Sequence, residues 1–180
     1  MDAPVLSYHD TLPLRWQPAQ GALPPAWAEQ NLRMLTALVA LGERVMVEVD
    51  TPGAAEFERL HHKFDLVIEL LGALLRTTRE AMPATPLRLS GTGLFWATSG
   101  DAPAAGTLLD VSVQLHACAP TPLQWRGEVV DCRDGELQLR FLAMPEALAC
   151  ALERHVFMQH RRSVAGARSP VQRGEKPAAP

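Results

Sequence analysis

Apolar residues recur at alternating intervals of three and four between residues 54 and 79, and this is the most regular pattern in the chain. The members of this series are Phe57, Leu60, Phe64, Val67, Leu71 and Leu74. The same spacing defines a left-handed coiled coil, so the pattern predicts a long helix from about Ala54 to Arg79. A first helix is predicted from about Ala26 to Val47, because Pro52 and Gly53 oppose a continuous helix.

The apolar stripe of the second predicted helix is wider than a two-stranded coil can cover. Ile68, Leu70 and Leu75 lie beside the repeat and would remain exposed in a simple pair of helices. The stripe could pack on the first helix, form a bundle between subunits, or cover a sheet. Two long helices of this kind exceed what a small barrel can cover, so we favour self-association.

From Pro86 to Met144 the pattern changes to a period of two, which is typical of strands. The clearest run has apolar side chains at alternate positions, namely Leu109, Val111, Val113, Leu115 and Ala117. Asp134 and Gly135 mark a tight hairpin further on. Short strands at this spacing predict a small antiparallel barrel or sandwich.

Two shorter segments flank these zones. Alternating apolar residues from Leu12 to Trp16 predict a strand at about 11–16, placed at an edge because Pro13 cannot donate a ladder hydrogen bond. After Pro145, apolar residues recur every four positions and predict a closing helix to about Arg162. Residues 163–180 are rich in Ala, Pro, Gly and Arg, which predicts a disordered tail, either solubilising or weakly anion-binding.

Composition narrows the class of protein. The chain has 180 residues, of which 47% are hydrophobic and 21% charged, which is typical of a globular protein. Its net charge of −3 offers no cationic field for nucleic acid, and its three cysteines form no CxxC pair. No signal peptide and no apolar run of membrane-spanning length is visible, so we expect a cytoplasmic protein without membrane insertion.

The sequence offers no residues for catalysis. Walker, HExxH and GxSxG motifs are absent from the sequence. His61 and His62 are adjacent and would point about 100° apart on a helix, so they cannot share a metal. His155 and His160 are interpreted as surface groups of the closing helix. We therefore expect no enzyme, no catalytic residues and no metal.

One local motif has the character of a ligand-binding turn. It begins at Arg88 and contains Ser90, Gly91 and Gly93. A serine followed by two glycines lets the backbone turn sharply and expose N–H groups that can receive an anion. An ordinary glycine-rich hairpin is the alternative interpretation.

These pieces in order resemble a PilZ domain, in which the Ser90 turn opens the strand series and a closing helix ends in His-Arg-Arg. PilZ domains are six-stranded antiparallel barrels that typically bind cyclic di-GMP through an RxxxR stretch and a D/N-x-S-x-x-G turn. Ser90 and Gly93 match the second motif, but Arg88 stands at its first position. No RxxxR precedes the barrel, since Arg76 and Arg79 have the wrong spacing. Between Pro86 and Met144, four arginines accompany six acidic residues.

The long helices are similar to an atypical PilZ group that forms tetramers through heptad helices and lacks the standard cyclic di-GMP motifs. This resemblance implies an α+β, mainly β-barrel domain over residues 6–162, with strands at about 11–16 and 86–144 and helices inserted at about 26–80. It implies a homotetramer whose interface is the heptad series, and an adaptor in bacterial signalling, motility or virulence with a signalling or pilus-associated partner. It implies no cofactor. A cyclic di-GMP receptor using Arg88, Ser90, Gly91 and Gly93 remains the alternative.

Overall fold

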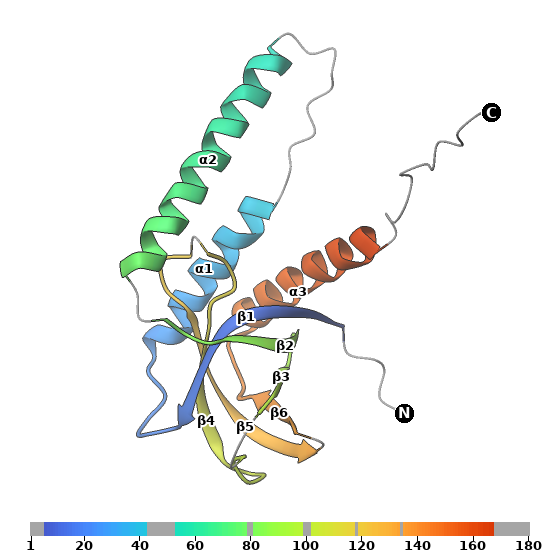
Figure 1. Ribbon diagram of the computed structural model, residues 1–180. Coiled ribbons are helices and arrows are strands. Elements are labelled where there is room, and N and C mark those ends of the chain that lie inside the picture. Colours follow the sequence, from blue (N-terminus) through green and yellow to red (C-terminus); the bar gives the residue numbers. More distant parts are fainter. Residues whose placement is uncertain are drawn as a thin grey trace, which may run out of the picture.

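The computed structural model describes residues 6–42, 53–78, 81–98, 102–117, 119–133 and 135–167. Six strands form a closed antiparallel barrel in the order β1-β2-β3-β6-β5-β4 (Figure 1). The strands are β1 (Ser7–Pro18), β2 (Ala84–Ser90), β3 (Gly93–Ala97), β4 (Leu108–Val113), β5 (Leu123–Arg133) and β6 (Glu136–Phe141). The predicted six-stranded barrel is therefore confirmed.

Three helices accompany the barrel: α1 (Ala26–Gly42), α2 (Ala54–Thr78) and α3 (Glu146–Ala167). The first two lie between β1 and β2 in the chain, as the sequence predicted. Residues 43–52 and 79–80, which include the predicted end of each of these two helices, lie outside the described residues. The closing helix runs five residues beyond its predicted end at Arg162, into the segment predicted to be a tail.

β1 is not the edge strand that the sequence predicted. Its first half, Ser7 to Pro13, pairs with β2, and its second half pairs with β4. Pro13 lies where β1 exchanges one neighbour for the other, and its carbonyl oxygen accepts a hydrogen bond from the Gln114 backbone N–H at 3.0 Å. A proline is tolerated inside this closed barrel because the strand changes partners at that point.

The barrel interior is filled by the inward positions of the strands. The most deeply buried large side chains include Trp96, Leu89, Leu94, Leu109, Leu123, Leu137 and Leu139. β4 is shorter than its alternating pattern suggested, because the Gln114 side chain donates to the His116 and Ala119 carbonyls and turns the chain away. Leu115 is nevertheless buried.

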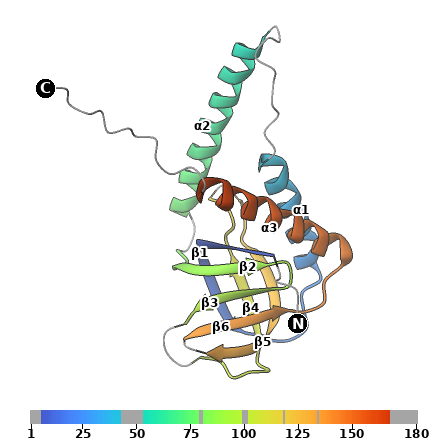
Figure 2. The same cartoon turned by 90° about the vertical axis from the view of Figure 1, so that its right-hand side faces the viewer.

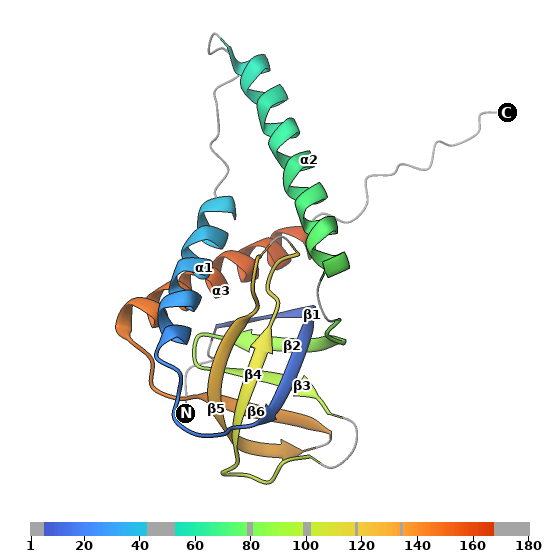
Figure 3. The ribbon, with the colours of Figure 1, turned by 90° about the vertical axis from the view of Figure 1, so that its left-hand side faces the viewer.

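Two of the helices pack on the barrel. α1 is fixed to β5 by Asn31, whose amide donates to the Gln124 carbonyl at 2.6 Å and accepts the Gln124 N–H at 3.0 Å. Figure 3 shows α1 above the wall that β1, β4 and β5 form. α3 packs against α1 and β1, placing Leu152 and Val156 in the core, and Figure 2 shows it crossing one end of the barrel.

A buried ion pair ties the segment after β1 to the barrel. Arg126 on β5 donates to both carboxylate oxygens of Asp110 on β4, at 2.7 and 3.0 Å. The same guanidinium donates to the carbonyls of Gly21 and Gln20. Arg126 therefore serves the architecture and is not available to a ligand.

Candidate ligand turn and self-association helix

The Ser90 hydroxyl closes the turn between β2 and β3. It accepts the backbone N–H of Gly93 at 3.0 Å and of Thr92 at 3.3 Å, and it donates to the Gly93 carbonyl at 3.0 Å. A hydroxyl has one donor and two acceptor positions, and all three are used here. Because Ser90 is also only 2% exposed, it shapes the turn instead of presenting a polar group to solvent.

Of the two glycines of the turn, Gly93 is required by the neighbouring backbone, whereas Gly91 lies under a side chain. A Cβ atom at Gly93 would lie 2.3 Å from the carbonyl oxygen of Leu139, because β3 and β6 approach closely there. A Cβ at Gly91 would lie 2.8 Å from Cγ of Glu153 on α3. The side chain of an acidic residue therefore covers the turn that was a candidate anion site.

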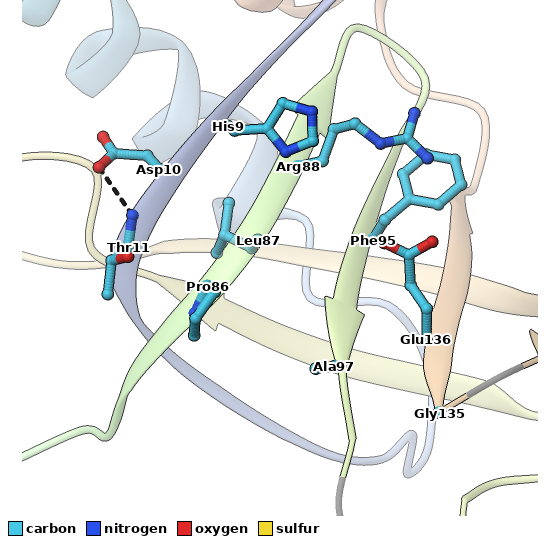
Figure 4. A pocket seen from close by; sticks show the side chains of 10 residues that line it. All are labelled: His9, Asp10, Thr11, Pro86, Leu87, Arg88, Phe95, Ala97, Gly135 and Glu136. Atoms are coloured by element: carbon cyan, nitrogen blue, oxygen red, sulfur yellow. Dashed lines mark hydrogen bonds between the residues drawn. The ribbon is translucent and has the colours of Figure 1, made fainter.

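Most of the barrel arginines already form ion pairs with acidic residues of the same chain. Arg126 is buried in its ion pair, and Arg133 is paired with Asp131. Arg140 on β6 donates to Glu128 at 2.8 Å. Arg88 on β2 lies over the Phe95 ring, with its guanidinium carbon 3.5 Å from the ring centroid (Figure 4).

The structure brings Arg140 to the candidate turn, which the sequence did not predict. Arg140 is the cross-strand partner of Gly93, and it lines a hollow of about 540 Å³ together with Arg88, Ser90 and Phe95. Predicting that Arg140 lies beside Gly93 requires the register of β3 against β6. That register could not be predicted, because the sequence does not show that these two strands are neighbours. The site therefore has two guanidinium groups around it, of which one is already paired.

α2 exposes nearly all of its apolar side chains. The exposed members are Phe57 (39%), Leu60 (51%), Phe64 (58%), Leu66 (55%), Val67 (50%), Leu70 (61%), Leu71 (51%) and Leu74 (60%). Among the described residues, the pairs of elements that pack closely do not include α2. Figures 1 and 2 show this helix projecting away from the barrel. The interpretation that α2 covers a sheet of its own subunit therefore does not hold.

The histidines and cysteines fall in varied environments. His61 stacks on Phe57 with ring centroids 5.4 Å apart, and His62 is an exposed flank of the helix. Cys132 and Cys150 are free, whereas Cys118 lies outside the described residues. Within the part of the chain that the structure describes, no group of three His, Cys, Asp or Glu residues could hold a metal.

The expectation that His155 is a surface group was wrong, whereas His160 is half-buried. His155 is 3% exposed, and its Nε2 lies 3.4 Å from the Tyr8 hydroxyl. Burial, followed by the charges of Arg162 and His116, lowers the pKa of His155 to about 4. His160 Nδ1 lies 2.8 Å from the carbonyl oxygen of Ser7. Periodicity places His155 beside Leu152 and Val156, so an inward position was readable from the sequence.

A closed six-stranded barrel, interrupted by two helices after its first strand and ending in a packed helix, defines a PilZ-type domain. Residues 32–169 match the profile of the family described as "Atypical PilZ domain, cyclic di-GMP receptor". The chain belongs to this atypical PilZ family, as its resemblance predicted. The family description is that of a receptor domain.

The fold also matches a solved structure over nearly its full length. That structure is of a pathogenic protein from Xanthomonas campestris, described as a new tetrameric PilZ domain self-assembled via an unusual helical bundle. It is 30% identical, with a TM-score of 0.66, and the match covers 91% of this chain and 93% of that one. No curated protein matches the chain. None of the described helices is long and apolar enough to cross a membrane.

Proposed function

We propose that this protein is a non-enzymatic signalling adaptor that forms a homotetramer through α2 and acts through protein partners, without binding cyclic di-GMP by itself. The observation that carries the proposal is the row of exposed apolar side chains along α2, which is apolar beyond its heptad positions. A monomer with that surface in water is unfavourable, since contiguous exposed apolar patches mark interaction sites. The tetrameric structural relative supports the same stoichiometry here.

The charges beside the apolar stripe of α2 favour a parallel bundle. One flank carries the bases Arg59 and Lys63, with Glu56 paired to Arg59, and the other flank carries Glu58 and Asp65. In a parallel bundle, the basic flank of each helix faces the acidic flank of its neighbour at the same height along the bundle, so acids meet bases. Antiparallel neighbours would instead bring like flanks together.

Apolar residues on the flanks agree with that orientation. Leu66 and Leu70 lie on the basic flank, and Ile68 lies on the acidic flank at a similar height. Parallel neighbours would bury these side chains against one another. Antiparallel neighbours would place Leu70 nearer to Arg59 and Lys63, leaving apolar surface against charge.

The turn at Ser90 supports the proposal that the protein does not bind cyclic di-GMP by itself. The Ser90 hydroxyl has no bonding capacity left, and Glu153 covers Gly91. A cyclic dinucleotide presents two phosphates, which bidentate arginines normally meet. Of the candidate arginines, only Arg88 has no acidic partner among the described residues.

Two measurements on one sample test the proposal. Light scattering should give a mass close to four times 19.7 kDa, and titration calorimetry with cyclic di-GMP should show no heat of binding. A monomeric mass would contradict the assembly. Micromolar binding of the dinucleotide would favour the alternative function below.

The alternative is a cyclic di-GMP receptor that uses non-standard arginines. The observation that favours it is the placement of Arg88 and Arg140 around one hollow next to the Ser90 turn. Its test is the variant Arg88→Gln with Arg140→Gln, which would abolish binding while the barrel stays folded. Ser90→Ala is a poorer test, because that hydroxyl also holds the turn together.

A further inference from the structure

The apolar stripe of α2 is bordered differently in its two halves. In the half that ends at Thr78, Leu66, Ile68 and Leu70 widen the stripe. In residues 54–65, which we call the polar half, the stripe is bordered by polar side chains, namely Glu56, Glu58, Arg59, His61, Lys63 and Asp65. Figure 1 shows the polar half projecting away from the barrel. Because no other described element packs closely on α2, the neighbours of these side chains come from the other subunits of the proposed assembly.

The heptad repeat determines which polar side chains meet across two helices. Positions a and d are occupied by the apolar series, namely Phe57, Leu60, Phe64, Val67, Leu71 and Leu74. Position g is then occupied by Glu56 and Lys63, and position e by His61 and Ile68. In a parallel coiled coil, a residue at g meets the residue at e in the next heptad of the neighbouring helix. Glu56 therefore meets His61 of the neighbouring subunit, whereas Lys63 meets Ile68.

Within its own subunit, His61 is held beside the apolar stripe. Its ring stacks on Phe57, with ring centroids 5.4 Å apart and an angle of 30° between the ring planes. Glu58 and Asp65 lie on the same flank of the same helix, one turn before and one turn after His61. Their attraction for a protonated His61 acts in the monomer and in the assembly alike. The contact that changes on assembly is therefore the one with the basic flank of the neighbouring helix.

The basic flank presents Glu56, Arg59 and Lys63 to the His61 ring of a neighbour. Glu56 and Arg59 form an ion pair of 3.5 Å, in which their side chains are 73% and 74% exposed. Exposed pairs of this kind contribute little stability, so Glu56 can also accept a hydrogen bond from the neighbouring His61. The same ion pair offsets the charge of Arg59, and Lys63 lies at the position that meets Ile68. The Glu56 carboxylate is therefore the group of this flank that is best placed to bind the imidazole ring.

The contact between Glu56 and His61 forms in only one orientation of the helices. In an antiparallel bundle the e positions of neighbouring helices face each other, so His61 would meet apolar side chains such as Ile68. A protonated imidazole beside Ile68 would lose water without gaining a partner. Protonation would then weaken an antiparallel assembly, whereas it would strengthen a parallel one.

We propose that the carboxylate of Glu56 binds the imidazole of His61 in the neighbouring α2 helix, and that protonation of His61 strengthens self-association. Histidine is the side chain whose charge ordinarily changes between pH 5 and pH 8. A protonated ring donates both of its N–H groups, so one of them can form a charge-assisted hydrogen bond with Glu56. Each subunit in a closed ring of helices contributes Glu56 to one such contact and His61 to another. This inference rests on the proposed assembly through α2, whose response to pH it defines.

Fluorescence-detected sedimentation of the labelled full chain, over a dilution series at pH 8.0 and at pH 6.0, tests the inference. The concentration at which half of the chains are dissociated should be roughly threefold lower at pH 6.0. His61→Gln should remove this dependence on pH, because glutamine does not titrate. The matched control is His62→Gln, which changes the next residue on the exposed face of the helix and should keep the wild-type dependence. If the chain stays assembled at the lowest concentration, the same series is run with Val67→Ala added throughout, which weakens the apolar stripe and leaves both partners in place.

A reversal of charge separates this contact from a general effect of charge. His61→Glu should raise the half-dissociation concentration roughly tenfold at pH 8.0, because it places a second carboxylate opposite Glu56. Glu56→Lys combined with His61→Glu restores opposite charges, and it should return the concentration to within about threefold of the wild type. Absence of this recovery, a dependence on pH that persists in His61→Gln, or assembly that is no stronger at pH 6.0 would overturn the inference. A chain that is monomeric at every concentration would instead contradict the proposed assembly itself.

Discussion

The Ser90 hydroxyl is an example of a motif residue that the fold has already engaged. The sequence placed a serine and two glycines in a turn, and that turn exists between β2 and β3. The sequence could not show that the hydroxyl bonds to Gly93 and Thr92, or that Glu153 covers Gly91, because Glu153 comes from a helix about 60 residues away. Local patterns predict elements well, whereas contacts between distant elements need the topology.

Ser90→Ala should destabilise the barrel. The substitution leaves the buried N–H of Gly93 without its acceptor, and we expect the free energy of unfolding to fall by about 2 kcal/mol. Urea denaturation measures this loss. Ser112→Ala, on a half-buried position of β4, should cost much less; similar losses in both variants would contradict a special role for Ser90.

His155 should make the stability of the protein sensitive to acid. Its pKa is lowered to about 4 in the folded chain, whereas an unfolded histidine takes up a proton near pH 6.5. The unfolded state therefore binds more protons between these values, so stability present above pH 6.5 is lost as the pH falls towards 4. From pH 7.5 to pH 5 the loss should be about 2 kcal/mol.

Urea denaturation at the two pH values checks this effect in His155→Gln, which cannot titrate at that position. The variant should lose less stability on acidification than the wild type. His9→Gln, which removes an exposed histidine, should behave as the wild type does. A wild-type loss no larger than that of His155→Gln would show that another group is responsible.

At the scale of elements, α2 differs from the other described elements because its apolar heptad stripe packs closely against none of them within one subunit. The pattern predicted the helix and its exposed stripe, and both are present. The barrel strands were predicted from their period of two, but their order was not, because alternation carries no information about which strand is adjacent. Because the strand order was unknown, the sequence could not show that β1 pairs with β2 up to Pro13 and with β4 beyond it.

Replacing Phe64 and Leu71 by Asp should dissociate the assembly. Each substitution places a carboxylate in the middle of the apolar stripe, where it would be buried without a partner. Light scattering should then report a monomer, and circular dichroism should report a folded barrel. His62→Asp, on the exposed polar flank, should keep the mass of the wild type; an unchanged mass in the double variant would place the interface elsewhere.

At the scale of the whole molecule, the buried core side chains of the described residues lie between Tyr8 and Val156. α3 continues to Ala167, but its side chains from Arg161 to Ala165 are exposed. The predicted domain limits of 6–162 remain a prediction, and the core of the described residues lies within them. The helix extends five residues further than predicted, over 163–167, and the side chains described there, at 163–165, are exposed.

Removing residues 163–180 should leave the fold intact, because the core side chains of the described residues end at Val156. Differential scanning calorimetry should show a melting temperature within about 2 °C of the full chain. Truncation from His155 onward provides the contrast, since it removes Val156 and the Tyr8 contact. A clear drop on removing residues 163–180 would show that this segment docks on the domain.

The position of the two long helices between β1 and β2 has a consequence for the order of events during synthesis. β1 leaves the ribosome first but cannot meet β2 until residues 19–83 have been made, because Pro13 and Ala84 are cross-strand neighbours. α2 is therefore complete before the barrel can close. The proposed assembly through α2 would therefore be open to nascent chains translated from one message while each barrel is still incomplete.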